Sequence, residues 1–144
     1  MSTFLIRHYK SADETSVIEL WKICGLVVSH NDPAKDITRK LKVDSEWFLV
    51  GECEDIVVAT CMVGYDGHRG CVNYLAIHPE HQGCGYGRRL MEKAEEILKN
   101  EGCPKVNLLV RNSNTEVLSF YDTLGYSDNQ CISLGKRLIS DQPE

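Results

Sequence analysis

Apolar residues recur along the chain with two spacings, one typical of strands and the other of helices. Runs rich in β-branched and other apolar residues predict six strands, at residues 4–8, 47–53, 56–65, 71–77, 106–110 and 131–138. The run at 56–65 is almost continuously apolar, so we expect a central strand that is buried on both faces. Short turns, one of them at residues 66–70, separate it from its neighbours, as in antiparallel hairpins.

Apolar positions three and four residues apart predict four helices between these strands. The clearest lies within residues 78–98, where charged residues occupy one face and the other face is apolar, formed by Leu90, Met91, Ala94, Ile97 and Leu98. Asn100 and Gly102 close this helix. A further helix is expected at residues 115–124, ended by Gly125.

Capping residues mark the other two helices. Ser11 and Glu14 have the spacing of a capping box at the start of the first helix, and Gly25 ends it. Asp32 followed by Pro33 predicts the N-terminus of the second helix, which runs to about residue 43.

The order of these elements, β-α-α-β-β-β-α-β-α-β, predicts one α/β domain that spans residues 1–144. A chain of this length can bury a hydrophobic core without disulfides or a structural metal. The helix between residues 71–77 and 106–110 implies a crossover and a parallel pair, whereas hairpins imply antiparallel pairs elsewhere. We therefore expect helices around a mixed, mostly antiparallel sheet.

Composition narrows the classes of function. The net charge of −5, with acidic and basic residues interspersed, argues against nucleic-acid binding. No apolar run approaches the length of a membrane span, and the N-terminus lacks the apolar core of a signal peptide. The seven cysteines are odd in number and contain no C-x-x-C pair, which predicts reduced thiols in a cytoplasmic protein.

His78, His81 and Cys84 stand three residues apart and are the candidate metal ligands. Pro79 and the glycines that follow interrupt the segment, and no fourth ligand lies nearby in the sequence. We therefore expect no metal.

Three alternate glycines, Gly83, Gly85 and Gly87, stand between the strand at 71–77 and the amphipathic helix. The first amides of a helix have no partner within it, and glycines let an anion approach them closely, so the segment predicts a phosphate site. A kinase-type P-loop needs Lys and Ser or Thr where Arg88 and Arg89 stand, and a dinucleotide fingerprint needs a different glycine spacing.

Two motifs resemble signatures of the GNAT N-acetyltransferases. Gln82-x-x-Gly85-x-Gly87, which runs from a strand into a helix, resembles their acyl-CoA-binding signature. The segment from Asn114 through Tyr121 to residues 125–126 resembles their second signature, and Asn114 and Tyr121 lie two helical turns apart on one face. Other stretches, at residues 31–33, 65–70, 102–105 and 134–139, are similar to the YpeA-type branch of small bacterial GNAT proteins.

The resemblance implies the GNAT acyl-CoA N-acyltransferase fold, of the α/β (α+β) class, with a six- to seven-stranded sheet and about four helices. It implies acetyl-CoA as co-substrate, whose acetyl group passes directly to an amine. The pantetheine arm and the acetyl oxygen would bind backbone groups of Leu75, Ala76 and Ile77. The pyrophosphate would bind Gln82 and the amides of Gly83, Cys84, Gly85, Tyr86, Gly87 and Arg88.

The family also implies roles for two residues of the second signature. Asn114 would contact the pantetheine arm, and Tyr121 would act as general acid to the thiolate that leaves. A thiolate at Cys84 would be favoured by its place before a helix, although loop packing accounts for that residue as well.

The general base departs from the family pattern. Many GNAT proteins carry Glu where Asn73 stands here, and others carry an acid where Leu108 and Leu109 stand. The remaining candidates lie on predicted loops, and they are His30, Asp66, His68 and Glu80. His68 is preferred because histidine titrates nearest neutral pH, but a turn histidine bound to backbone explains it equally.

Without a strong base, the acceptor is expected to be an α-amine rather than a long polyamine. A lysine-type amine with a pKa of ~10.4 is roughly 0.05% neutral at pH 7, whereas an α-amine near ~8 is about a tenth neutral. The apolar linker at residues 26–28 is a candidate wall of the acceptor site. By analogy with GNAT proteins that dimerise through C-terminal strands, a homodimer is expected.

Three rival functions remain open from the sequence. An acetyl-CoA-binding module without turnover would fit the missing acids. A dinucleotide-binding protein is disfavoured by the glycine spacing, and a cysteine-based redox or metal protein by the cysteine spacing.

Overall fold

Five strands form one twisted sheet in the computed structural model, which describes residues 3–142. The strands follow one another across the sheet in chain order: β1 (Phe4–His8), β2 (Phe48–Cys53), β3 (Ile56–Tyr65), β4 (Gly70–Ile77) and β5 (Val106–Asn107). The pairs from β1 to β4 are antiparallel, and β5 is parallel to β4. The expected mixed, mostly antiparallel sheet is therefore confirmed.

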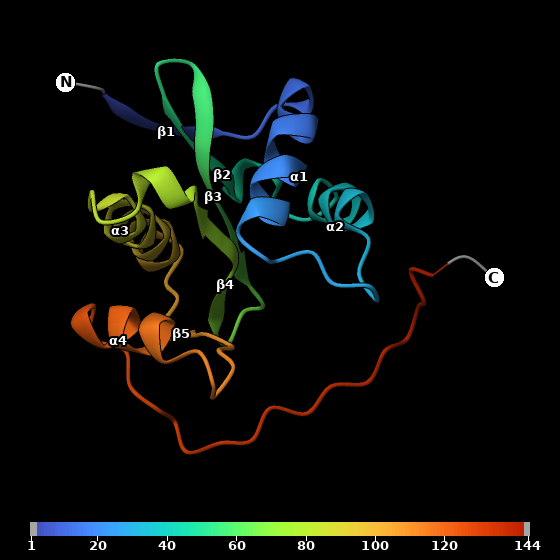
Figure 1. Ribbon diagram of the computed structural model, residues 1–144. Helices are drawn as coiled ribbons and strands as arrows, with labels where there is room; N and C mark the ends of the chain where they lie inside the picture. Colours follow the sequence, from blue (N-terminus) through green and yellow to red (C-terminus); the bar gives the residue numbers. More distant parts are fainter. Residues whose placement is uncertain (1–2, 143–144) are drawn as a thin grey trace.

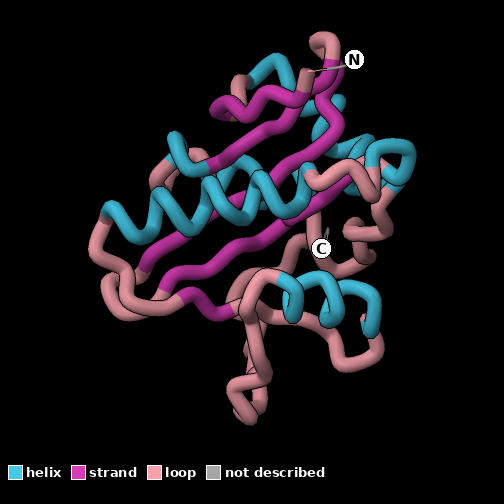
Figure 2. Tube along the Cα trace, turned by 90° about the vertical axis from the view of Figure 1, so that its left-hand side faces the viewer, coloured by secondary structure: helices cyan, strands magenta, loops and turns pink. Residues whose placement is uncertain are grey.

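Four α-helices cover this sheet: α1 (Glu14–Ile23), α2 (Pro33–Lys40), α3 (Tyr86–Asn100) and α4 (Thr115–Thr123). Figure 1 shows α1 and α2 on one side of the strands and α3 on the other, with α4 below α3 near β5. Figure 2 shows α3 lying along the sheet face. Short 3₁₀ turns precede α1, β2 and α3, at Ser11–Asp13, Ser45–Trp47 and Pro79–His81.

A core lies on each face of β3, which is buried from both sides as its apolar run predicted. On one face the apolar side of α3 packs on the sheet, with Leu90, Met91, Ala94 and Leu98 buried. On the other face α1 contributes Val17, Leu20 and Trp21. The sheet thus separates two sets of helices.

Most predicted helix ends are confirmed by their contacts. Asp32 caps α2 with its Oδ1, which accepts hydrogen bonds from the amides of Ala34 at 2.9 Å and Lys35 at 3.3 Å. Gly25 and Gly125, which follow α1 and α4, adopt left-handed φ values of 72° and 92° that glycine tolerates best.

The start of α1 differs from the predicted capping box. Asp13, not Glu14, reaches back, and its Oδ2 accepts a 2.8 Å hydrogen bond from the Lys10 amide. Arg7 holds the same carboxylate through two further bonds of 2.8 and 2.9 Å. A local spacing rule could not include Arg7, because the partner comes from β1. The helix at α2 also ends earlier than predicted, at Lys40 rather than near residue 43.

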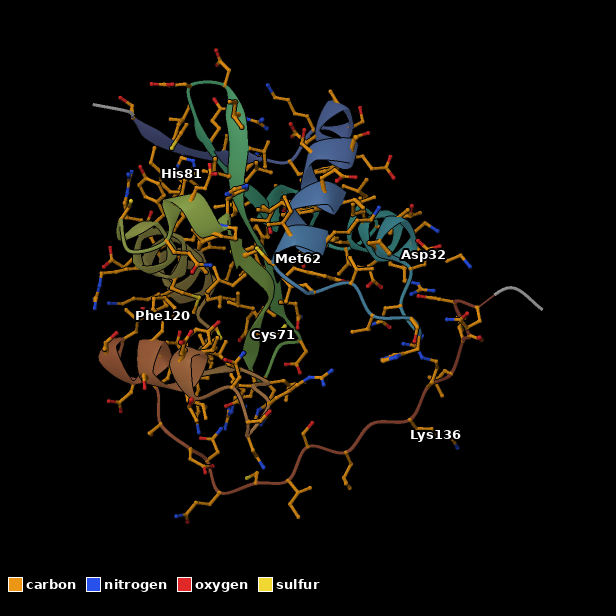
Figure 3. All side chains as sticks on the ribbon, viewed as in Figure 1. Asp32, Met62, Cys71, His81, Phe120 and Lys136 are labelled. Carbon is orange, nitrogen blue, oxygen red and sulfur yellow. The ribbon has the colours of Figure 1, made fainter. Side chains whose placement is uncertain are left out.

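The predicted sixth strand, residues 131–138, is wrong, and so is the six- to seven-strand count for the described residues. That segment is extended but joins no ladder, with Ile132 and Leu134 87% and 90% exposed. Figure 3 shows its side chains, Lys136 among them, standing clear of the sheet. The predicted strand at 106–110 is also shorter, since only Val106–Asn107 pairs with β4. An alternating pattern indicates a tendency to extend, but a strand also needs a partner.

Candidate functional site

The edge of β4 that faces β5 is open along most of its length. The two strands pair only at Gly70–Val106 and Cys71–Asn107, after which the chain of β5 turns away. Among the described residues, the backbone of β4 beyond Cys71 has no strand partner on that side. An open strand edge can bind an extended ligand through backbone hydrogen bonds.

A β-bulge lies in the middle of this open edge. Thr60 pairs with Ala76 and Met62 with Asn73, so Tyr74 and Leu75 together oppose one residue of β3. Tyr74 has a φ of 52°, a left-handed value that costs a non-glycine residue about 1–3 kcal/mol. The bulge directs Leu75 toward the α3 core and Tyr74 toward the α1 core. Bulges of this kind re-aim side chains beside active sites.

The glycine turn begins where β4 ends. The Gln82 side chain folds back, and its Nε2 donates a 3.1 Å hydrogen bond to the carbonyl oxygen of Ile77. Gly83 and Gly85 adopt φ values of 80° and 83°, and Gly85 is the residue before α3. A Cβ at either glycine would meet no described atom within 4 Å, so their backbone faces open space.

Gly87 serves a different purpose from the other two glycines. A Cβ there would lie 3.1 Å from Cζ of Phe120, a residue of α4 that is labelled in Figure 3. The missing side chain therefore lets α4 pack against the first turn of α3. Sequence reasoning assigned all three glycines to the ligand, and this packing role was missed.

The arginines after the turn hold neighbouring elements. Arg88 is exposed, with its Nη2 3.5 Å from the carbonyl oxygen of Thr123 near the end of α4. The guanidinium of Arg89 lies over the ring of Phe4, 5.0 Å from the centroid, and Tyr86 stacks on the same ring at 4.0 Å. Cys84 is exposed in the turn.

The second signature lies on α4. Oδ1 of Asn114 accepts a 3.4 Å hydrogen bond from the Val117 amide, so this exposed residue caps the helix. Tyr121 is half-buried against the α3 core, with Tyr126 edge-on at 5.6 Å. Burial raises the pKa of the Tyr121 hydroxyl to about 12, which keeps it protonated at neutral pH.

Among the described residues, the hydrogen bonds of Tyr74 at the bulge go to Thr60 and Asp36 and not to a predicted loop candidate for the general base. His68 lies exposed in the β3–β4 turn, where its amide donates to Oδ1 of Asp66 at 2.7 Å. Bonds from the amides of Arg69 and His68 lower the pKa of Asp66. Tyr74 is four residues beyond Gly70, the first residue of β4, which is ~13 Å along a strand. His30 is exposed on a loop, whereas Glu80, predicted on a loop, is exposed in the 3₁₀ turn at Pro79–His81.

One polar contact at the bulge was missed from the sequence. The Tyr74 hydroxyl donates a 2.6 Å hydrogen bond to Oδ2 of Asp36, a residue of α2. The two residues are 38 positions apart and Asp36 belongs to a highly charged helix, so no local pattern indicated the pair.

No three His, Cys, Asp or Glu side chains gather as metal ligands would in the part of the chain that the structure describes. Within the same residues, no helix has the length and apolar character needed to cross a membrane. All seven cysteines are free thiols.

Comparison with known proteins agrees with this geometry. The Acetyltransferase (GNAT) family matches residues 13–126. Acetyltransferase YE1169 of Yersinia enterocolitica is 45% identical over 137 residues, which cover 95% of this chain and 97% of that protein. The chain therefore belongs to the GNAT acetyltransferase family, and it is an acyltransferase. The predicted family is confirmed.

Solved structures show the same fold at low sequence identity. The complex of AAC(6')-Iy with the bisubstrate analogue CoA-S-monomethyl-acetylneamine has a TM-score of 0.77 at 14% identity, covering 96% of this chain and all of that one (100%). The ribosomal-protein-S18-alanine N-acetyltransferase from Escherichia coli has a TM-score of 0.72 at 18% identity, covering 85% and 77%. The predicted fold is thus confirmed although this sheet has fewer strands than expected.

Proposed function

We propose that this acyltransferase moves an acetyl group from acetyl-CoA directly to an amine. The observation that carries the proposal is the adjacency of two open backbone surfaces, the glycine turn before α3 and the unpaired edge of β4 at the bulge. The first can take a pyrophosphate and the second an extended pantetheine arm. A CoA thioester has both groups, joined in that order.

In this proposal, Gln82 and the amides of residues 83–88 hold the pyrophosphate. The first amides of α3 and the side chain of Arg88 supply positive potential there. The carbonyl oxygen of Ile77 already accepts hydrogen bonds from Nε2 of Gln82 and Sγ of Cys24, at 3.1 and 3.3 Å. Leu75 and Ala76 therefore supply most of the backbone bonds to pantetheine and to the acetyl oxygen, which polarises the carbonyl toward attack.

Tyr121 is the proposed general acid. Its raised pKa keeps the proton available until the CoA thiolate leaves and takes it. Asn114, two helical turns before Tyr121 on the same face, would bind the pantetheine arm through Nδ2. His68 stays a proposed base only if the acceptor extends to the β3–β4 turn.

The acceptor is proposed to be an α-amine of a small molecule or peptide. An α-amine is more often neutral at pH 7 than a lysine-type amine, so it depends less on a strong base. Neither Asn73 nor the residues at 108 and 109 provide a carboxylate for that role. The names of the two solved structures above concern an aminoglycoside-type analogue and a ribosomal-protein alanine, and a shared fold does not choose between such acceptors.

A homodimer completed by the C-terminal segment is part of the proposal. The segment is tied at both ends: Asn129 bonds Lys105 and Asn107 at 2.9 Å each, and Asp141 bonds Arg39 at 2.6 Å. Between these ties, apolar side chains are 67–90% exposed, namely Ile132, Leu134, Leu138 and Ile139. Between its ends, residues 131–138 of this segment form no strand pair with β5 of their own chain. The sheet edge at β5 of a second copy offers it the missing strand partner.

The free thiols support a reducing, cytoplasmic location as a further part of the proposal. One alternative function is an acetyl-CoA-binding module with little turnover. It is favoured by Asn73, which is exposed where related enzymes carry an acid, and whose Nδ2 lies 3.9 Å from Sγ of Cys71.

Thermal melting with acetyl-CoA, CoA and NADH tests the cofactor. A ligand at 100 times its Kd stabilises by ~2.7 kcal/mol, which is roughly 5–10 °C in Tm for this size. We expect a shift with acetyl-CoA and CoA but none with NADH. Equal shifts with NADH would contradict the assignment.

CoA release with a panel of α-amines, ε-amines and polyamines tests turnover. Tyr121→Phe should lower kcat by about 10²-fold with an unchanged acetyl-CoA shift, since general acid catalysis contributes at least that much. Binding without CoA release from any amine would favour the binding module. Spermidine outpacing every α-amine would overturn the acceptor class.

Size-exclusion chromatography with light scattering tests the dimer. Leu134→Lys should convert a dimer to a monomer, because a charge would be buried against the second copy. Ile56→Lys is the matched control, since Ile56 is 65% exposed at the start of β3, away from this segment. A monomeric wild-type protein would refute the dimer.

A further inference from the structure

Tyr74 and Asp36 form a short polar contact that joins the bulge of β4 to α2. The 2.6 Å hydrogen bond runs from the Tyr74 hydroxyl on β4 to Oδ2 of Asp36 on α2. The Tyr74 ring stacks on Trp21 of α1 with centroids 3.8 Å apart. Both helices of that face therefore fix the position of the hydroxyl, although it sits on a strained residue.

Two tyrosines pack on opposite faces of the sheet, Tyr74 from the bulge of β4 and Tyr121 from α4. Tyr121 packs with the α3 core, whereas Tyr74 packs with the α1 core. The backbone of Leu75, which would hold the acetyl oxygen, follows Tyr74 directly, with Cα atoms ~3.8 Å apart. If the thioester lies along the edge between the two faces, the leaving sulfur can face Tyr121 and the attacking amine can face Tyr74.

We propose that Tyr74 accepts the proton of the acceptor amine and that Asp36 is the positioning residue that takes the Tyr74 proton in the same step. The inference rests on the proposed acetyl transfer. It assigns the base function to the α2 side of the sheet, rather than to the loop residues that the sequence offered.

The step balances as follows for a neutral amine. The amine nitrogen bonds the acetyl carbon, and the carbon–sulfur bond breaks. The amine proton passes to the Tyr74 oxygen while the Tyr74 proton passes to Oδ2 of Asp36. The CoA thiolate takes the Tyr121 proton, and exchange with water afterwards restores Asp36 and Tyr121.

The surrounding charges favour a relay over a free phenolate. Burial, and next the bond to Asp36, raises the pKa of Tyr74, so the hydroxyl keeps its proton until it can pass it on. Nη1 of Arg39 lies 3.2 Å from Oδ1 of Asp36, which leaves Oδ2 for Tyr74. Arg39 is also bound to Asp141 of the C-terminal segment at 2.6 Å. The Asp36 carboxylate is thus held in one orientation, with 24% of its side chain exposed for proton exchange with water.

Steady-state kinetics of CoA release test the relay with the best α-amine from the panel. Tyr74→Phe removes the hydroxyl and keeps the ring stack on Trp21, so kcat should fall about 10²-fold while the acetyl-CoA shift in Tm is unchanged. Asp36→Asn should lower kcat with little change in KM, and Asp36→Glu should recover part of it. The double variant should be no slower than Tyr74→Phe by more than a few-fold, because the two groups act as one unit.

Tyr9→Phe is the matched control. Tyr9 stacks on Phe48 at 4.4 Å in the same core but lies outside the site, so its variant should keep wild-type kcat. A Tyr74→Phe protein that binds acetyl-CoA and turns over within two-fold of wild type overturns the relay and leaves the acetyl transfer standing. A wild type that releases no CoA with any amine overturns both. Should Tyr74→Phe not fold, an Asp36→Asn protein with wild-type kcat overturns the relay.

Discussion

Two regions of the chain carry clear apolar patterns but differ in what their apolar side chains contact. They are residues 78–102, which include α3, and the C-terminal segment at residues 127–142. In the first, the apolar face of α3 meets a sheet face of the same chain, so pattern and structure agree. In the second, the apolar side chains meet solvent. A helix satisfies its backbone internally, whereas a strand depends on a partner that a sequence pattern cannot name.

Truncation of one leucine in each region should give the largest difference between the two regions, measured as the loss of unfolding free energy. Leu90→Ala on α3 removes a fully buried side chain and should lower the unfolding free energy by about 2–5 kcal/mol. Leu134→Ala should change it by less than about 0.5 kcal/mol, because that side chain is exposed in the single chain. Urea unfolding at a protein concentration that holds the monomer measures both. A loss at Leu134 equal to that at Leu90 would mean that the segment packs on its own chain.

Within the first region, the glycines at the two ends of α3 separate an effect on stability from an effect on acetyl-CoA binding. Gly85 and Gly102 have nearly the same left-handed φ, 83° and 84°, with open space around each. Alanine at either should lower stability by about 1–2 kcal/mol, because a Cβ is strained there. Only Gly85→Ala should also lose the acetyl-CoA shift in Tm, since only that amide faces the proposed pyrophosphate. Equal shifts in the two variants would remove the glycine turn from the binding site.

The smallest effect is expected at the end of the C-terminal segment. The guanidinium of Arg39, with the Asp32 amide, lowers the pKa of Asp141 to about 2. A carboxyl whose pKa is lower in the folded protein stabilises it above the unfolded value, about 3.9, and that stabilisation is lost as pH falls toward 2.

The Tm difference between wild type and Asp141→Asn should therefore be present at pH 6 and vanish near pH 2. Asp122→Asn on α4 is the control, and its difference from wild type should not follow that pH course. A constant difference for Asp141→Asn would mean that the carboxylate charge does not hold the segment.

Much of the fold follows from local chemistry. A sequence pattern can predict features that depend on neighbouring residues. These include the burial of β3 on both faces, the Asp32 N-cap of α2 and the glycines that end α1 and α4. The glycine turn was found for the same reason. The bulge at Tyr74 was not, because it depends on the register between β3 and β4.

The missed site contacts are those between distant residues. Asp36 meets Tyr74 across 38 positions, and the close approach of Gly87 to Phe120 joins two helices. His68, chosen for its chemistry alone, lies exposed in the β3–β4 turn, where its amide bonds Asp66. Side-chain chemistry can nominate a residue, but only the packing of elements shows what it can reach.

The contact of Gly87 with Phe120 has a consequence for timing. Phe120 is the residue before Tyr121, so the first turn of α3 bears directly on the helix that carries the proposed acid. A ligand that moves the start of α3 by a few tenths of an ångström would displace the Tyr121 hydroxyl through this helix contact, without a movement of the sheet. Under the proposed mechanism, binding of the donor and placement of the acid share this contact, and a Cβ at position 87, 3.1 Å from Cζ of Phe120, would push α4 away from α3.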